Sequence, residues 1–266
     1  MTSIGIVGCG AIGRTVLQAA DDGRLTAPIA GVTSRTESTA RAFLATLRRP
    51  VSYLGLDELA YRADLLVEAA GGEVVPKLAA KAFAAGKDLM VISAGALLDH
   101  PEVAAQARAS GCRLIVPSGA IAGLDGIKSA CAGDVWKVAM TSRKPPRGLD
   151  GAPYLLERGV SLTGLDHELE VFSGSAREAC RGFPQNVNVS AAVSLAGIGA
   201  DRTMIRIIAV PGLERNCHDI EVEGEFGLLR VHIENVPSEN PRTGRLTMLS
   251  IMRAVADAVD PVRIGS

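Results

Sequence analysis

The sequence predicts an α/β fold, in which a doubly wound parallel sheet is joined to a smaller α+β domain with a mainly antiparallel sheet. Three observations indicate it. A glycine-rich turn lies between an apolar strand and a helix at the start of the chain. Apolar strand-like segments then alternate with helix-like segments, the order typical of a parallel sheet covered by helices. From residue 203 onward, longer strand-like segments follow one another across turns, which indicates an antiparallel sheet.

The chain opens with an apolar strand at residues 3–7, glycines at positions 8, 10 and 13, and a helix that begins near Ala11. In a dinucleotide-binding turn the first glycine permits a tight turn, the second lets the backbone approach a pyrophosphate, and the third lets the helix pack on the strand. The phosphates bind N–H groups at the helix N-terminus. The pattern predicts a Rossmann-type domain with cofactor contacts at Gly8, Gly10, Ala11, Ile12 and Gly13.

The remaining strands and helices of the first half follow in alternation. We expect strands within residues 28–34, 63–71, 87–93 and 112–118, and helices within residues 37–47, 73–86 and 101–111. Two of these helices end at a glycine, Gly86 and Gly111, as helices often do at their C-caps. The strands are apolar on both faces, which suits a sheet with helices on both sides.

The second half is organised differently. We expect a loop that enters a helix over residues 118–133, then a strand within residues 134–146. Segments 203–210 and 217–235 predict an antiparallel meander with a hairpin at Gly224 to Gly227. The final helix, over about residues 243–259, should return to the first domain. Its apolar residues are Leu246, Leu249, Ile251, Met252 and Val255.

The length of 266 residues allows one large domain or two of ordinary size, and either could bury a core. We expect residues 1–120 plus about 240–266 to form the dinucleotide-binding domain. Residues from about 121 to 239 should then form the domain that carries the substrate site, catalysis and oligomerisation.

The composition argues against several classes of partner and site. The 28 lysines and arginines nearly balance 29 aspartates and glutamates, which argues against nucleic acid or a membrane surface as a partner. No apolar run is long enough to cross a bilayer, and the first charged residue, Arg14, follows the apolar start, unlike in a secretory signal. Five cysteines without a C-x-x-C pair indicate a reducing compartment and no metal site. We therefore expect a soluble, cytoplasmic protein.

The residues after the second strand affect the choice of nicotinamide cofactor. In NAD-binding domains an acidic side chain there holds the ribose 2′-OH, but this chain has Ser34 and Arg35 at that place and no carboxylate before Glu37. Ser34 could donate a hydrogen bond to a 2′-phosphate, and Arg35 could pair with it. The pair favours acceptance of NADP, with NAD as the alternative. The other interpretation of Arg35 is a solvated loop cation.

Several longer motifs point to a known family. They are GCGAIG at 8–13, VPSGAIAGLDGI at 116–127, SRKPP at 142–146, SGSAREA at 173–179, and the segments 182–203, 214–227 and 235–250. Together they resemble the L-aspartate dehydrogenase family, from near residue 3 to the C-terminus. The resemblance implies a Rossmann domain, a smaller α/β domain that carries catalysis, and a homodimer. It also implies reversible NAD(P)-dependent oxidation of L-aspartate to iminoaspartate, which hydrolyses to oxaloacetate and ammonia.

The same resemblance implies roles for particular residues. The family's catalytic histidine lies in an Asn-x-His motif, which Asn216, Cys217 and His218 match. The family contacts its cofactor through the alanine of a Gly-Ala-Ile motif and the second asparagine of a Phe-Pro-x-Asn-x-Asn motif, here Ala120 and Asn188. The serine and arginine after the second strand depart from a pattern of strict NAD use.

A histidine also fits the chemistry of this reaction. Oxidation moves a hydride from Cα to the nicotinamide and leaves an iminium that water attacks, and a histidine of near-neutral pKa can exchange the amine or water proton. From spacing alone each of the four histidines could be structural: His100 lies beside Asp99 at a helix start, and His167 and His232 have no partner motif. Only the family resemblance singles out His218 as the catalytic residue. Cys217 beside it should point to the opposite side of an extended strand, which argues against a shared metal site.

A dicarboxylate substrate requires cations or amides. Arg143, Lys144 and Arg202 could bind a carboxylate, and Asn186 could hydrogen-bond it, although each could instead be a solvated or structural side chain. Two other functions stay open: a reductase of another small imino or keto acid on the same scaffold, and a non-catalytic NAD(P)-sensing protein. A sensor would need neither the histidine nor the amides, and no DNA-binding pattern is visible.

Overall fold

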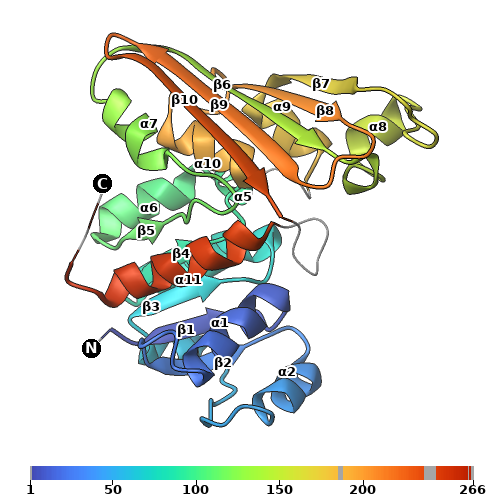
Figure 1. The fold of residues 1–266 in the computed structure, drawn as a ribbon. Coiled ribbons are helices and arrows are strands. Elements are labelled where there is room, and N and C mark those ends of the chain that lie inside the picture. Colours follow the sequence, from blue (N-terminus) through green and yellow to red (C-terminus); the bar gives the residue numbers. More distant parts are fainter. Residues whose placement is uncertain (1, 185–187, 237–243, 263, 265–266) are drawn as a thin grey trace. The chain divides into compact units, whose positions relative to one another are not determined.

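The computed structural model describes residues 2–184, 188–236, 244–262 and 264 (Figure 1). The chain divides into two compact units. The first contains the chain up to Pro117 together with the segment that starts at Met248, and the second contains Ser118–Thr247. Ala120 therefore belongs to the second unit.

The first unit is built on a five-stranded sheet, which we call sheet A. Its strands lie in the order β2-β1-β3-β4-β5, and every neighbouring pair is parallel. The chain order reverses between β1 and β3, which is the switch point beside which such sheets bind ligands. The strands are β1 (Ile4–Val7), β2 (Ile29–Thr33), β3 (Leu65–Glu68), β4 (Asp88–Val91) and β5 (Leu114–Ile115).

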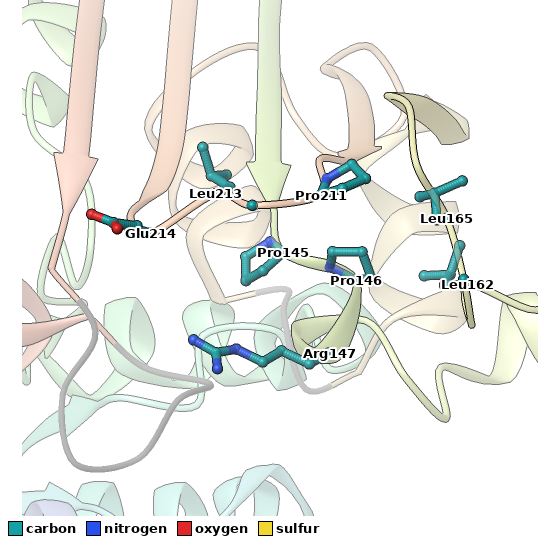
Figure 2. A pocket seen from close by; sticks show the side chains of 10 residues that line it. Pro145, Pro146, Arg147, Leu162, Leu165, Pro211, Leu213 and Glu214 are labelled. Carbon is teal, nitrogen blue, oxygen red and sulfur yellow. The ribbon is translucent and has the colours of Figure 1, made fainter.

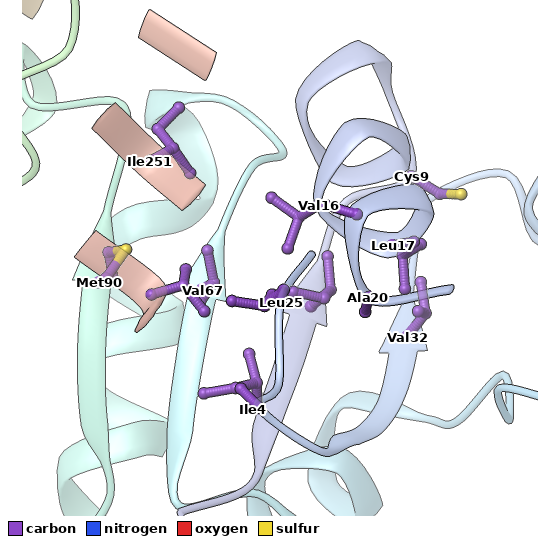
Figure 3. Close-up of a cluster of buried hydrophobic side chains, with 14 of the residues drawn as sticks. Ile4, Cys9, Val16, Leu17, Ala20, Leu25, Val32, Val67, Met90 and Ile251 are labelled. Carbon is purple, nitrogen blue, oxygen red and sulfur yellow. The ribbon is translucent and has the colours of Figure 1, made fainter. Parts of the chain in front are cut away.

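Helices cover both faces of sheet A, and the prediction of a doubly wound parallel sheet is confirmed. Three helices pack on one face around apolar side chains such as Ile4, Val67 and Met90 (Figure 3). They are α1 (Ala11–Asp21), α2 (Glu37–Leu44) and α11 (Arg245–Val259). The opposite face is covered by α3 (Leu56–Arg62), α4 (Val75–Ala84) and α6 (Glu102–Ser110). Two short helices, η1 (Gly72–Val74) and α5 (Ala96–Asp99), lie in the connections.

The ends of the helices agree largely with the sequence. Gly86 and Gly111 follow α4 and α6 with φ values of +66° and +70°, a conformation that glycine adopts without strain. The last helix does return to the first unit, where Ile251 and Val255 are buried in the same cluster as α1. Leu249, another apolar residue of this helix, is 56% exposed and does not belong to the buried cluster.

The second unit is built on another five-stranded sheet, sheet B, with the strand order β10-β9-β6-β8-β7. The strands are β6 (Val135–Lys144), β7 (Leu169–Ser175), β8 (Met204–Ala209), β9 (Asn216–Gly224) and β10 (Gly227–Asn235). Helices α7 (Leu124–Ala130), α9 (Ala176–Gly182) and α10 (Asn188–Ala196) pack against it, and η2 (Pro146–Gly148) and α8 (Pro153–Glu157) lie between β6 and β7.

The order of these strands corrects one prediction. The hairpin at Gly224 to Gly227 is confirmed, but the last three strands do not form a simple meander. Strand β6 lies between β8 and β9, and it pairs parallel with β8 and antiparallel with β9. Patterns along the sequence identify strands but not partners distant in the chain, so the central place of β6 was not visible. The sheet remains mainly antiparallel.

Each strand of sheet B alternates between two faces. We call the face covered by helices the inner face; it holds Val138, Met140, Ile205, Ile220 and Val222, all of which are buried. The outer face carries charged side chains that pair across strands, among them Lys137 with Glu221 and Glu223, Arg230 with Glu221, and Arg206 with Glu170.

Two findings bear on location. No helix in the described ranges is both long enough and apolar enough to span a membrane. None of the five cysteines, all of which lie in described segments, forms a disulfide. The compartment stays a prediction.

Candidate active site

The glycine turn of the first unit requires glycine at two positions for reasons internal to the fold. Gly8 has a φ of +110°, and a Cβ on it would lie 2.4 Å from the carbonyl oxygen of Ala69. A Cβ on Gly13 would lie 2.0 Å from the carbonyl oxygen of Gly8. A side chain at either position would displace backbone, so these two glycines set the path of the turn.

Gly10 is different, because a Cβ on it would meet no atom within 4 Å. It is the exposed N-cap of α1, and no side chain in the described structure caps this helix. The side chain of Ile12 packs against the core, so Ala11 and Ile12 would reach a ligand through their backbone N–H groups. Open space above a helix N-terminus fits the pyrophosphate of a dinucleotide.

The loop after β2 presents the residues predicted to select the cofactor. The backbone of Ser34 is held by the Tyr53 hydroxyl, which donates to its carbonyl oxygen at 2.8 Å. The side chain of Arg35 is exposed and makes no ion pair with any residue in the described ranges. The carboxylate of Glu37 pairs with Arg41 at 2.7 Å, so its repulsion of an anion bound nearby is reduced.

A residue that the sequence analysis missed joins two loops at the same edge of sheet A. Glu68 ends β3 and is fully buried. One carboxylate oxygen accepts the N–H groups of Ala70 and Gly71, both at 2.8 Å, and the other accepts those of Ser93 at 2.9 Å and Ile92 at 3.2 Å. A single carboxylate at the end of an apolar run was the signal that could have revealed it.

His218 lies on the inner face of sheet B, in β9, and only 2% of it is exposed. Its Nδ1 is 2.9 Å from the hydroxyl of Ser142, directly opposite on β6. Burial, together with the positive charge of Lys144, lowers the pKa of His218 to about 3. The expectation of a near-neutral pKa is therefore wrong: the imidazole is neutral at physiological pH, because its charged form would lose its hydration.

Lys144 is two residues beyond Ser142 in β6 and shares the inner face with it. The β6–β9 register pairs Ser142 with His218 and ends at Arg143 and Cys217, so Lys144 and Asn216 are the next residue of each strand beyond that last pair. Lys144 is only 6% exposed, and burial lowers its pKa to about 8. Sequence alternation along β6 could have placed Ser142 and Lys144 on one face, but their approach to His218 depends on the pairing of β6 with β9.

A second hydrogen bond connects this end of the sheet to the Gly-Ala-Ile motif. Asn235 pairs with Asn216 across β10 and β9, and both are buried. The side-chain amide of Asn235 donates to the carbonyl oxygen of Ala120 at 2.6 Å. Asn235 therefore holds in place the residue that the family resemblance assigns to cofactor contact, a role that the sequence alone did not indicate.

Comparison with known proteins agrees with this geometry. Residues 125–258 match the family model described as "Aspartate dehydrogenase, C-terminal", and residues 8–117 match the NAD-binding domain model of homoserine dehydrogenase. The L-aspartate dehydrogenase of Methanosarcina mazei is 44% identical over 272 residues, with 100% of both chains covered. The chain belongs to the aspartate dehydrogenase family.

Two other comparisons support this membership and the fold. L-aspartate dehydrogenase 3 of Bordetella bronchiseptica is 43% identical over 264 residues, which cover 99% of this chain and 97% of that one. The crystal structure of aspartate dehydrogenase from Thermotoga maritima superimposes with a TM-score of 0.77 over 100% of both chains, at 22% identity. The prediction of the family is confirmed.

In this member of the aspartate dehydrogenase family, two predicted substrate cations lie away from His218. Arg143 points to the outer face, where it pairs with Asp219, because neighbours in a strand face opposite sides. The exposed Arg202 donates to the carbonyl oxygen of Val135 at 3.4 Å, at the opposite end of β6 from Lys144. Nine residues of strand correspond to about 30 Å. Of the three cations, only Lys144 lies beside His218.

The two predicted asparagines differ in what the structure says of them. Asn188 is exposed and is the first residue of α10, which packs on the inner face of sheet B. Asn186 lies outside the described residues. The contacts of both with cofactor or substrate stay predictions.

A pocket of about 570 Å³ lies at the end of sheet B that carries Lys144 and Asn216 (Figure 2). Pro145, which lines it, directly follows Lys144, and Glu214 precedes β9 by two residues. Arg147 and Leu162 add a cation and an apolar side chain. This volume is in the range of small-molecule sites, so the second unit offers ligand-sized space next to these strand ends.

The other histidines and Cys217 lie apart from the buried side chains of Ser142, Lys144 and His218. His232 is on the outer face of β10, where Asp219 accepts from it at 2.6 Å and raises its pKa. His100 and His167 pair with the nearby carboxylates of Glu102 and Asp166. These pairs with exposed carboxylates agree with the structural or surface roles expected for the three histidines. Cys217 is on the opposite face from His218, and burial raises the pKa of its thiol.

Proposed function

We propose that this protein oxidises L-aspartate to iminoaspartate, which hydrolyses to oxaloacetate and ammonia, and that it also catalyses the reverse reaction. One observation carries the proposal: the Asn-x-His motif of a chain 44% identical to an L-aspartate dehydrogenase places its histidine in a buried polar group with Ser142 and Lys144. A non-catalytic NAD(P) sensor would not require such a group, because buried polar side chains have a desolvation cost.

The first unit supplies the cofactor site in this proposal. A bound nicotinamide would accept the hydride from Cα of the substrate. The N-terminus of α1, with open space above Gly10, binds the pyrophosphate, and Glu68 holds the loops after β3 and β4 in place. These groups bind and orient; the chemistry of hydride transfer belongs to the cofactor.

His218 is the proposed catalytic residue of the second unit. Ser142 occupies its Nδ1, so a proton or hydrogen bond can be exchanged with the substrate only at Nε2. A neutral imidazole can donate from one nitrogen and accept at the other, and the Ser142 hydroxyl can adapt to either tautomer. Burial of the ring keeps bulk water from competing for this contact.

We also propose that the protein accepts NADP, with Arg35 paired to the 2′-phosphate and Ser34 donating to it. The exposed position of Arg35, without an ion pair to any residue in the described ranges, supports this assignment. The pairing of Glu37 with Arg41 also supports it, because an unpaired carboxylate at that place would repel a phosphate.

A homodimer is the third part of the proposal. The outer face of sheet B exposes the apolar side chains of Met204 and Leu228 among its charged residues. Sedimentation equilibrium at micromolar concentration should give twice the chain mass of 27.6 kDa. A monomer under these conditions would contradict this part alone.

One assay tests the activity. The purified protein should oxidise NADH or NADPH when given oxaloacetate and ammonium, and should be much slower with 2-oxoglutarate or pyruvate. Turnover of one of the control acids instead would favour the alternative, a reductase of another small imino or keto acid. Binding of the cofactor without turnover of any acid would favour the sensor.

A further inference from the structure

The inner face of sheet B changes character within two residues. In the middle of β6 and β9 this face is apolar, with Met140 opposite Ile220. At the end of β6 and the start of β9 it carries Ser142 opposite His218, followed on the same face by Lys144 and Asn216, and all four are buried.

Lys144 and His218 are the only ionisable side chains on this inner face of the described strands. The charged residues of β7, β8 and β10, such as Glu170, Arg206 and Arg230, belong to the outer face, and α10 contains no charged residue. An ammonium group in such a place has a large desolvation cost, which lowers its affinity for a proton. A lysine that exchanges its proton during the reaction therefore fits this position better than a lysine that stays charged.

The proposed reaction needs a group that holds a proton. The substrate enters as an ammonium ion, and its nitrogen must lose one proton before its lone pair can form the C=N bond. His218 is a poor acceptor, because a pKa of about 3 means that a proton on its ring is lost at once near pH 7. Lys144, with a pKa of about 8, is close to the value at which a base works best near neutral pH.

We propose that Lys144 is the proton acceptor of the reaction, and that His218 stays neutral and hydrogen-bonds the substrate through Nε2. This inference rests on the proposed function. In the oxidative direction an N–H bond of the substrate ammonium breaks and an N–H bond forms on Nζ of neutral Lys144. The nitrogen lone pair then forms the C=N bond as the Cα–H bond breaks, and the hydride goes to the oxidised nicotinamide cofactor. In the reductive direction the Lys144 ammonium returns the proton.

The test uses two variants of Lys144 and a matched control. Lys144→Met removes the base, and Lys144→Arg keeps a cation that cannot lose its proton at any working pH. Lys128→Met changes an exposed lysine of the same unit. The kcat for aspartate oxidation should fall about 10²- to 10⁴-fold in both Lys144 variants and stay within about twofold in the control. Circular dichroism and cofactor binding verify that the variants are folded.

Two further measurements separate a base from a cation that only binds the substrate. The wild-type kcat/KM should rise about tenfold per pH unit up to about pH 8 and then level off. The kcat/KM of Lys144→Met should not show this rise with pH. Added methylamine should restore at least part of the oxidative activity of a third variant, Lys144→Ala, whose short side chain leaves room for the amine.

Three results would overturn the inference. In the first, Lys144→Arg keeps more than about a tenth of the wild-type kcat. In the second, Lys144→Met keeps the wild-type pH profile and only raises the KM for aspartate, which would make Lys144 a carboxylate ligand. In the third, the wild-type protein itself does not oxidise aspartate; the proposed function then fails as well, and this failure is distinct because it precedes any substitution.

Discussion

The glycine turn of the first unit and the polar group of the second unit are built in opposite ways. The polar group consists of Ser142, Lys144 and His218. The turn is made by residues within one short segment, in which Gly13 packs on the carbonyl of Gly8. The polar group is made by residues far apart in the chain: Ser142 and His218 are 76 positions apart, and the pairing of β6 with β9 brings them together.

In the proposed function, this difference separates the region that binds the cofactor from the region that carries catalysis. A local turn is specified by conformational requirements of its own residues, and its ligand contacts are backbone groups that most side chains would leave in place. A non-local group depends on strand register, since a slip of β9 by one residue would turn His218 to the outer face, away from Ser142 and Lys144. We therefore expect substitutions in the turn to affect stability or cofactor affinity, and those in the polar group to affect turnover.

The largest effect should come from His218→Ala. Turnover should fall about 10²- to 10³-fold, because the reacting substrate loses its hydrogen bond to Nε2 of His218, whose Nδ1 is bound by Ser142, while cofactor affinity should stay within about twofold. Steady-state rates and a cofactor titration measure the two quantities. If the cofactor titration changed as much as the rate, the separation between the two regions would be wrong.

A pair of glycine substitutions sharpens the comparison within the turn. Gly8→Ala should lower the free energy of unfolding by roughly 2–4 kcal/mol, because it forces a positive φ on alanine and brings its Cβ against the Ala69 carbonyl. Gly10→Ala should leave it unchanged within about 1 kcal/mol, since φ there is −84° and the space is open, but should weaken cofactor binding. Urea unfolding and a cofactor titration provide the readouts; equal stability of both variants would contradict the assignment.

Arg35→Ala should act on one cofactor only. Loss of a hydrogen-bonded ion pair to the 2′-phosphate should weaken NADPH binding by roughly 1.5–3 kcal/mol, and NADH binding should not change. Fluorescence titrations with both cofactors measure this. Equal weakening of the two would mean that Arg35 does not contact a 2′-phosphate.

The smallest effect concerns pH and the polar group alone. The pKa of His218 is about 3 in the folded protein and near 6.5 when unfolded, so stability is complete above pH 6.5 and falls as the unfolded chain takes up a proton below it. At pH 5 this loss amounts to about 2 kcal/mol. His232 acts in the opposite direction, because Asp219 and Glu234 raise its pKa.

Urea unfolding of the wild type and of His218→Gln at pH 7 and pH 5 isolates this contribution, because His232 is the same in both. The variant should lose about 2 kcal/mol less than the wild type on acidification. If the wild type and His218→Gln lost equal free energy of unfolding between pH 7 and pH 5, His218 would not be buried in its neutral form.

Much of this protein could be predicted from its sequence, because the relevant signals are local. Alternating apolar segments predicted sheet A and its helices, and the spacing of the glycines at 8, 10 and 13 predicted the turn after β1. The longer motifs of the second half identified the family and the Asn-x-His motif. These features depend on residues that are neighbours in the chain, or on the matching of whole segments.

Tertiary structure decided which of the predicted polar residues share a site. The insertion of β6 between β8 and β9 brought Ser142 and Lys144 beside His218, and it sent Arg143 to the other face. Burial at that place lowered the pKa values of His218 and Lys144. The sequence determined the elements, the family and the glycine turn, because these follow from local conformation and periodicity. Strand partners and desolvation decided the polar group, because both depend on residues that meet only after the chain has folded.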